Sequence, residues 1–138
     1  MKKLFSIAIV FLALVFVGAA LAQFPAPFEN AKRFALMQEP KEGIYQWTAE
    51  DPDNSGLHYF ISYWPENESV ILAVFSEEDG SLVALVLARD LFYAQQFIVS
   101  PMGLMLIDEK ELEKEKAIDL AFDFYRALVS KGLLPTLI

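Results

Sequence analysis

The chain contains no cysteine and only one histidine among its 138 residues. Without cysteine there can be no disulfides, no thiolate metal ligands, no cysteine nucleophile and no lipid-modified N-terminal cysteine. The single histidine further argues against a zinc or other transition-metal site. Because small eukaryotic secreted domains often depend on disulfides, this composition favours a bacterial protein whose fold is held by its core alone.

The sequence also lacks the short motifs that mark common enzyme classes. It has no G-x-S-x-G, H-E-x-x-H or G-x-G-x-x-G motif and no P-loop, and no residue pattern points to a cofactor. Basic residues are scarce, with 11 Lys and Arg against 19 Asp and Glu. An acidic surface repels phosphate groups, so we expect neither nucleic-acid binding nor attachment to anionic membranes.

An apolar N-terminal segment is the clearest feature that is present. Lys2 and Lys3 precede an apolar run over residues 4–17, and Ala20 and Ala22 provide the small residues typical of a cleavage site. This order predicts a secretory signal over residues 1–22 and an exported protein, periplasmic or extracellular. Cleavage after Ala22 removes two of the 11 basic residues and no acidic one, so the formal net charge falls from −8 to −10.

An uncleaved signal anchor is the alternative for this segment. Residues 4–22 would reach about 28 Å as a helix at about 1.5 Å per residue, close to the thickness of a hydrocarbon core. Pro25 and Pro27 soon after the small residues favour cleavage, after which the protein would have no membrane segment. Residues 23–138 then form a single domain, because the chain is too short for two.

The remaining pattern predicts an α+β fold. A short helix over residues 27–38 precedes an antiparallel meander of five to six strands, and a long helix over residues 109–131 packs on the sheet. Asp108 is the expected N-cap of the long helix, with Glu111 completing a capping box and Gly132 ending the helix. The expected strands cover residues 44–49, 57–64, 70–75, 82–88, 93–99 and 104–107.

Two of these strands, residues 70–75 and 82–88, are apolar at both alternating sets of positions. A half-exposed antiparallel strand alternates apolar with polar residues, so both faces of these strands must be covered. The C-terminal helix can cover one face. The other requires the N-terminal helix, a strongly curled sheet, a partner subunit or a bound apolar ligand.

Residues 51–56, with the sequence DPDNSG, resemble the start of a calcium-binding loop. Asp51, Asp53 and Ser55 would offer alternating hard oxygens to one cation, and Gly56 permits the sharp turn. Ser62 stands where the bidentate glutamate of such a loop should lie, and a strand follows instead of a helix. A calcium-stabilised structural domain is therefore one hypothesis, and an ordinary hairpin loop is the other.

His58 would have to serve any Ser-His-Asp device, because it is the only histidine. Ser62 is four positions away, about 13 Å along a strand at about 3.3 Å per residue, which is beyond hydrogen-bond reach. A small hydrolase using His58 or a pair of carboxylates therefore remains an alternative without a supporting spacing. Candidate acids lie in the expected turns, where they also serve solubility.

Aromatic residues are concentrated in the first expected hairpin, where Tyr and Trp combine apolar area with a polar tip. Cross-strand packing in the core competes there with a binding surface. Our leading hypothesis is a non-enzymatic exported binding or accessory module that holds a protein partner, a second copy of itself or an apolar small molecule. Its candidate binding residues are Tyr45, Trp47, His58, Tyr63 and Trp64.

Overall fold

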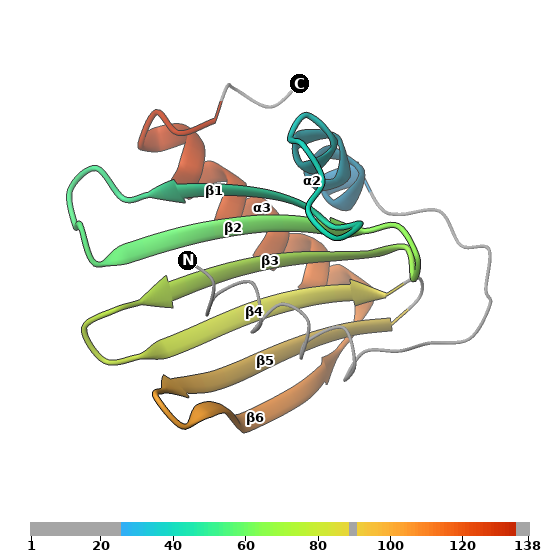
Figure 1. The fold of residues 1–138 in the computed structure, drawn as a ribbon. Helices are drawn as coiled ribbons and strands as arrows, with labels where there is room; N and C mark the ends of the chain where they lie inside the picture. The colour runs from blue at the N-terminus through green and yellow to red at the C-terminus, as the bar shows by residue number, and fades with distance from the viewer. Residues whose placement is uncertain (1–25, 89–90, 135–138) are drawn as a thin grey trace.

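The computed structural model describes residues 26–88 and 91–134, which form one six-stranded antiparallel sheet and two helices (Figure 1). The predicted α+β fold, with a short helix before the sheet and a long helix after it, is confirmed. The elements are α2 (Ala26–Leu36), β1 (Tyr45–Glu50), β2 (Leu57–Trp64), β3 (Ser69–Ser76), β4 (Ser81–Ala88), β5 (Leu91–Ser100), β6 (Gly103–Leu112) and α3 (Lys114–Ser130).

The sheet is a simple meander in which each strand pairs with the next in the sequence, in the order β1 to β6. Short turns rich in Pro, Gly, Asn and acidic residues connect the strands, as antiparallel neighbours require. Gly80 occupies one such turn with a φ of +69°. A Cβ at Gly80 would lie 2.8 Å from the carbonyl oxygen of Val99, so this turn requires glycine for space as well as conformation.

The start of the C-terminal helix was predicted wrongly. The sequence suggested a helix from residue 109 with Asp108 as its N-cap, but β6 continues to Leu112 and α3 begins at Lys114. Residues Glu109 and Glu111 pair in register with Gln95 and Tyr93 of β5. The backbone of the long strand β5 provides partners for this segment, and its charged side chains remain exposed at the sheet edge.

The end of α3 follows the prediction. Gly132 has a φ of +75°, and the N–H groups of Gly132 and Leu133 donate to the carbonyl oxygens of Val129 and Leu128 at 3.0 and 2.9 Å. These two bonds define a Schellman motif, which fixes the position of Lys131 beside the last helical turn. Most other predicted boundaries differ from the structure by one or two residues.

Both helices pack against the same side of the sheet, which we call the helix-covered face. Tyr125 of α3 is fully buried, and its hydroxyl donates a 2.6 Å hydrogen bond to the carbonyl oxygen of Pro27 in α2. Phe28 of α2 packs against Phe92 of β5, with ring centroids 5.9 Å apart. The buried sheet residues of this cluster are Tyr59, Ile61, Tyr63, Val70, Leu72, Leu85, Leu87 and Phe92.

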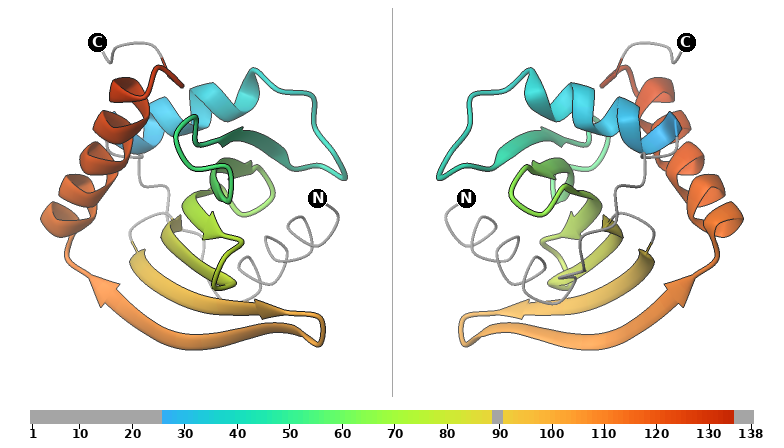
Figure 2. Two further views of the ribbon diagram at one scale, coloured as in Figure 1. Left: turned by 90° about the vertical axis from the view of Figure 1, so that its left-hand side faces the viewer. Right: turned by 90° about the vertical axis from the view of Figure 1, so that its right-hand side faces the viewer.

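The opposite side of the sheet, which we call the second face, forms a separate apolar cluster to which neither described helix contributes a residue. Figure 2 shows the sheet strongly curved, with α3 on one side of it. The buried residues of the second face are Ile44, Phe60, Trp64, Ile71, Ala73, Leu82, Ala84, Val86, Ala88 and Phe97, bordered by Phe75, Tyr93, Val99 and Leu104.

The N-terminal helix was one of the covers considered for the second face, and the structure excludes it. Buried residues Phe28, Ala31 and Ala35 of α2 all belong to the cluster of the helix-covered face. Within residues 26–88 and 91–134 no helix is long and apolar enough to cross a membrane. The expected signal over residues 1–22 lies outside the described residues.

Candidate binding face

The strand register places two alanines at the centre of the second face. Ala73 of β3 lies directly opposite Ala84 of β4, and both are buried. Their neighbours in the same row are Phe60 on β2 and Gln95 on β5. The rows on either side carry larger side chains, so the layer of side chains over the sheet is thinnest at the alanine pair. The flanking side chains are Ile71, Val86, Phe75 and Leu82.

Two amide oxygens interrupt the apolar character of this face. Gln95 is 1% exposed, and its Nε2 donates to Oε2 of Glu109 at 2.6 Å, but its Oε1 accepts no hydrogen bond. Oε1 of Gln46 on β1 is also buried without a hydrogen-bond partner. The register assigns both residues to the second face, Gln46 opposite Ser62 and Gln95 opposite Ala84.

A buried acceptor without a donor is costly, by about 1–3 kcal/mol relative to a satisfied one. Native structures contain few such groups, and a ligand donor is one way to satisfy them. The second face therefore combines a large apolar area with two unused acceptors, one on β1 at one edge of the sheet and one on β5 near the other edge. This arrangement suits a mainly apolar molecule that carries a hydroxyl or amide N–H.

The five binding residues predicted from the aromatic hairpin are divided between the two faces. Tyr45, Trp47 and Tyr63 pack in the helix-covered cluster, where the rings of Tyr45 and Tyr63 lie 6.4 Å apart. Trp64 lies in the second-face cluster, and its Nε1 donates to Oγ of Ser62 at 3.3 Å. His58 also lies on the second face, because the strand register places it opposite Phe75.

His58 is bonded to a carboxylate near the end of the β2–β3 pair. Its Nε2 makes a short contact with Oε2 of Glu77, and its ring lies 6.2 Å from that of Phe75. Among the described residues no serine hydroxyl forms a hydrogen bond with His58. The pair thus supplies a base and its orienting acid, but the described structure places no nucleophile beside them.

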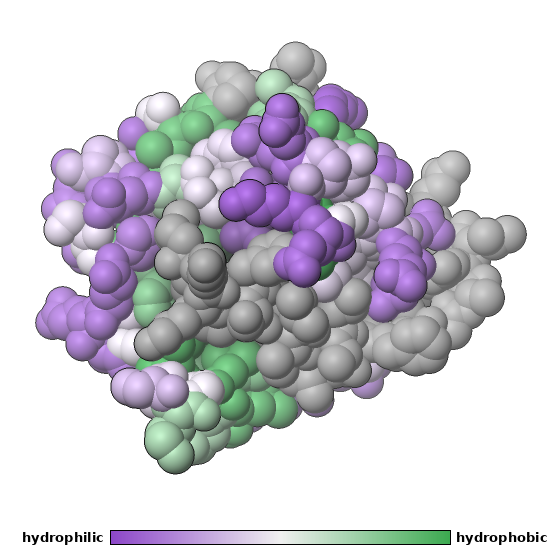
Figure 3. All heavy atoms as spheres, viewed as in Figure 1, coloured by the Kyte–Doolittle hydropathy of each residue, from purple (hydrophilic) through white to green (hydrophobic). Residues whose placement is uncertain are grey.

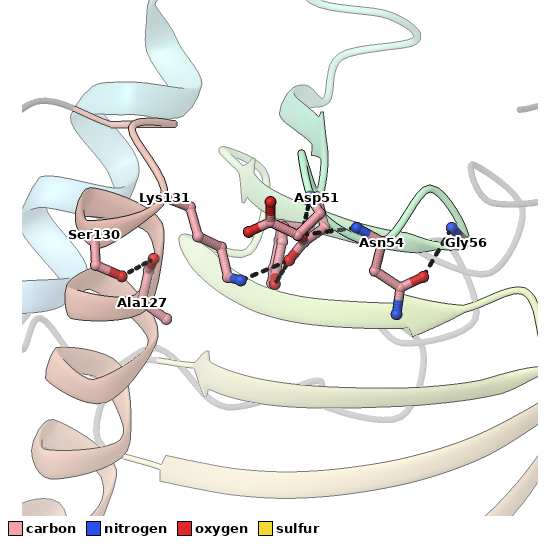
Figure 4. A network of polar contacts seen from close by, with 8 residues as sticks. Asp51, Asn54, Gly56, Ala127, Ser130 and Lys131 are labelled. Atoms are coloured by element: carbon pink, nitrogen blue, oxygen red, sulfur yellow. Dashed lines mark hydrogen bonds and ion pairs between the residues drawn. The ribbon is translucent and has the colours of Figure 1, made fainter.

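The side chain of Asp51 accepts several hydrogen bonds, although the residue lies in a loop (Figure 4). It is 4% exposed, and its Oδ1 accepts the backbone N–H groups of Asp53 and Asn54 at 2.8 and 3.1 Å. Its Oδ2 accepts the hydroxyl of Tyr59 at 2.6 Å and lies 2.9 Å from Nζ of Lys131. The network joins the β1–β2 loop to the end of α3.

These contacts stabilise the ionised carboxylate. The hydrogen bond from Tyr59, followed by those from Lys131 and the Asp53 backbone, lowers the pKa of Asp51 to about 2. Burial, together with the hydrogen bond to Asp51, raises the pKa of Tyr59 to about 12. Both groups therefore keep their usual charge state across the neutral range, and their role in this geometry is structural.

The same geometry bears on the calcium hypothesis for Asp51, Asp53 and Ser55. Both carboxylate oxygens of Asp51 are occupied, and the Lys131 ammonium lies where it would repel a cation. Across the described ranges no group of three or more His, Asp or Glu side chains is arranged to hold a metal ion. Asp51 instead initiates a turn through its own backbone neighbours.

Sequence reasoning missed Gln46, Gln95 and Lys131. A glutamine in a strand is ordinary, and only the pairing register shows that Gln95 lies on the second face beside Ala84. The contact of Lys131 with Asp51 joins residues 80 positions apart, so local spacing could not indicate it. The DPDNSG pattern drew attention to Asp51 as a residue with several partners. In the structure these partners are protein groups and not a cation.

Comparisons of the chain with protein-family models, with curated proteins and with solved structures found no match.

Proposed function

We propose that this protein is a non-enzymatic exported binding module that holds an apolar molecule bearing a hydrogen-bond donor on the second face of its sheet. The observation that carries the proposal is the placement of both described helices on one side, while the other side is apolar throughout its centre. Cleavage after Ala22 and a periplasmic or extracellular location belong to the same proposal.

The apolar composition of the second face supports a bound partner. Transferring one large apolar side chain from water into an apolar environment stabilises by about 1.5–3 kcal/mol, and this face presents several such side chains on adjacent strands. The central residues of this face are at most 7% exposed, and an apolar cluster of this size is stable only when it is kept from water. In the described part of the chain neither helix contributes to its cover.

The two amide oxygens support a particular ligand chemistry. Gln95 Oε1 and Gln46 Oε1 can accept hydrogen bonds but cannot donate them. A long-chain alcohol or amide offers an apolar body for the alanine row and a donor for one of these oxygens. An anionic ligand fits less well, because Glu109 and Glu111 lie on the β6 side of this face by register.

The first test uses protein exported from a bacterial host, so that any processing at residue 22 occurs naturally. Native mass spectrometry of the purified protein detects co-purified adducts, and the protein is then titrated with a long-chain alcohol and with the alkane of equal length. We expect binding of both, with about a five- to tenfold preference for the alcohol, as one hydrogen bond of about 1 kcal/mol provides.

Two matched variants locate the binding surface. Ala84→Phe fills the centre of the second face, whereas Val83→Phe alters the adjacent position of the same strand on the opposite side, where Val83 is exposed. We expect Ala84→Phe to abolish binding and Val83→Phe to retain it. Gln95→Leu should bind the alkane normally and lose the preference for the alcohol. Equal binding by Ala84→Phe and the wild type would refute the proposal.

A further inference from the structure

The edge strand β6 carries a second unexplained apolar surface. Met102, Met105 and Ile107 are 96%, 65% and 52% exposed, and β6 pairs only with β5 among the described strands. Figure 3 shows apolar side chains gathered at the β5–β6 end of the sheet. Large apolar residues exposed together on a strand edge create a template for pairing with another chain.

The rest of the sheet boundary is protected in the usual way. The other edge, β1, has only six residues and carries Gln46, Thr48 and Glu50. The second half of β6 carries charges at each of residues 108–111. Only residues 103–107 at the start of β6 have no charge on either side of the strand. Natural edges are normally blocked by charge or proline, so an unblocked stretch indicates use.

The backbone of this stretch has an identifiable open side. The N–H of Val99 in β5 donates to the carbonyl oxygen of Gly80 at 2.7 Å, away from β6. Because hydrogen-bonding direction alternates along an antiparallel strand, Ile98 and Ser100 direct their N–H and C=O toward β6. Their register partners are Met105 and Gly103. The N–H and C=O groups of Leu104 and Leu106 therefore face outward along the free edge.

We propose that a second copy of this chain pairs antiparallel with β6 through residues 103–107, about a two-fold axis at Met105. In this register Leu104 of one copy lies opposite Leu106 of the other, and these are the residues whose backbone groups face outward. Met105 then lies opposite its own copy in a non-hydrogen-bonded pair. The interface is self-complementary, as two-fold symmetry requires.

The distribution of charge selects this register over its neighbours. An axis at Leu106 would place Asp108 opposite Leu104, and an axis at Lys110 would place Glu109 opposite Glu111 and lysine opposite lysine. Like charges directly opposite each other in a sheet destabilise the pair. With the axis at Met105, the charged residues 108–111 extend beyond the partner's strand and remain in water.

Pairing through this edge is independent of ligand binding on the second face. The axis of an antiparallel strand pair is perpendicular to the sheet, so the two copies form one continuous sheet with their second faces on the same side. A dimer without ligand supports the pairing alone, and a ligand-binding monomer supports the proposed function alone. The two proposals therefore succeed or fail separately.

The absence of cysteine makes a direct cross-linking test clean. Met105→Cys in the exported protein places one thiol per chain on the proposed axis, where Cα atoms of a non-hydrogen-bonded pair lie about 4.5 Å apart and within disulfide range. Met37→Cys is the control, because Met37 is 75% exposed and lies beyond α2. We expect near-complete disulfide dimer for Met105→Cys under mild oxidation and little for Met37→Cys.

A reversible measurement accompanies the cross-link. Light scattering after size exclusion should give a dimer for the wild type and for Met37→Lys, and a monomer for Met105→Lys. Since Met105 and Met37 are both largely exposed, neither lysine should prevent folding, which a thermal melt verifies. A monomeric wild type, a Met105→Lys variant that remains dimeric, or equal cross-linking of the two cysteine variants would each overturn the proposal.

Discussion

Replacing Tyr125 with phenylalanine isolates the contact that holds the two helices together. The Tyr125 hydroxyl donates to the carbonyl oxygen of Pro27 at 2.6 Å, and both residues are buried. The bond joins α3 to the start of α2, between positions that are 98 residues apart in the sequence. Burial raises the pKa of Tyr125, so the hydroxyl stays protonated and remains a donor at any ordinary pH.

The expected loss follows from the groups that remain after the substitution. Phenylalanine fills nearly the same volume, so no cavity forms, and the Pro27 carbonyl keeps its helical donor, the N–H four residues on in α2. The loss is therefore that of one buried hydrogen bond, about 0.5–1.5 kcal/mol. We expect the free energy of unfolding of Tyr125→Phe to fall by about 1 kcal/mol, with an unchanged denaturant slope because the surface exposed on unfolding is the same.

Urea unfolding followed by far-ultraviolet circular dichroism measures this change. Tyr63→Phe is the matched control, because Tyr63 is buried in the same cluster and its hydroxyl has no hydrogen-bond partner in the described structure. Its unfolding free energy should stay within about 0.5 kcal/mol of the wild type. If the two variants were equally stable, the Tyr125 bond would not contribute to joining the helices.

Two further predictions concern the ends of the sheet. Gly80→Ala should destabilise the fold by more than about 2 kcal/mol, because the added Cβ meets the Val99 carbonyl oxygen at 2.8 Å and the φ of +69° is unfavourable for alanine. Gly43 has a φ of +83° but nothing within 4 Å of an added Cβ, so Gly43→Ala should lose only the stability that the unfavourable φ costs. Because its pKa is lowered from 3.8 to about 2, Asp51 contributes stability that is complete above pH 3.8 and is lost as the pH falls through about 2. The melting temperatures of the wild type and of Asp51→Asn should therefore converge in that window and differ most above it, and a constant difference down to pH 2 would contradict this role.

The fold could be predicted because its signals are local. Residues 57–64 gave the bounds of β2 without error, and the apolar strands β3 and β4 correctly indicated that both faces need cover. The helix start at residue 109 failed for a non-local reason. Residues 108–111 have a helix-like charge pattern, and only the presence of β5 alongside makes them a strand.

The binding face was predictable in kind but not in detail. The sequence could not decide which side α2 covers, because its apolar stripe of Phe28, Ala31 and Ala35 fits either face. The structure decides this through the Tyr125 hydroxyl and through the pairing of Phe28 with Phe92. Because α2 and α3 pack on the same side, the aromatic residues of the first hairpin belong to two different faces. Of the predicted binding residues, only Trp64 and His58 lie on the second face.

Charge separates the surfaces that meet water from the two surfaces that we propose bind a ligand or a second copy. The turns between β1 and β2, between β2 and β3, and between β3 and β4 all carry acids, and the second half of β6 is charged at four successive positions. Against that background the uncharged centre of the second face and the uncharged residues 103–107 are exceptions. In a chain with 19 acidic and 11 basic residues, two apolar surfaces stand out, one at the centre of the second face and one along the sheet edge. The second face presents side chains and the edge presents backbone, so the first suits an apolar ligand and the second suits another strand.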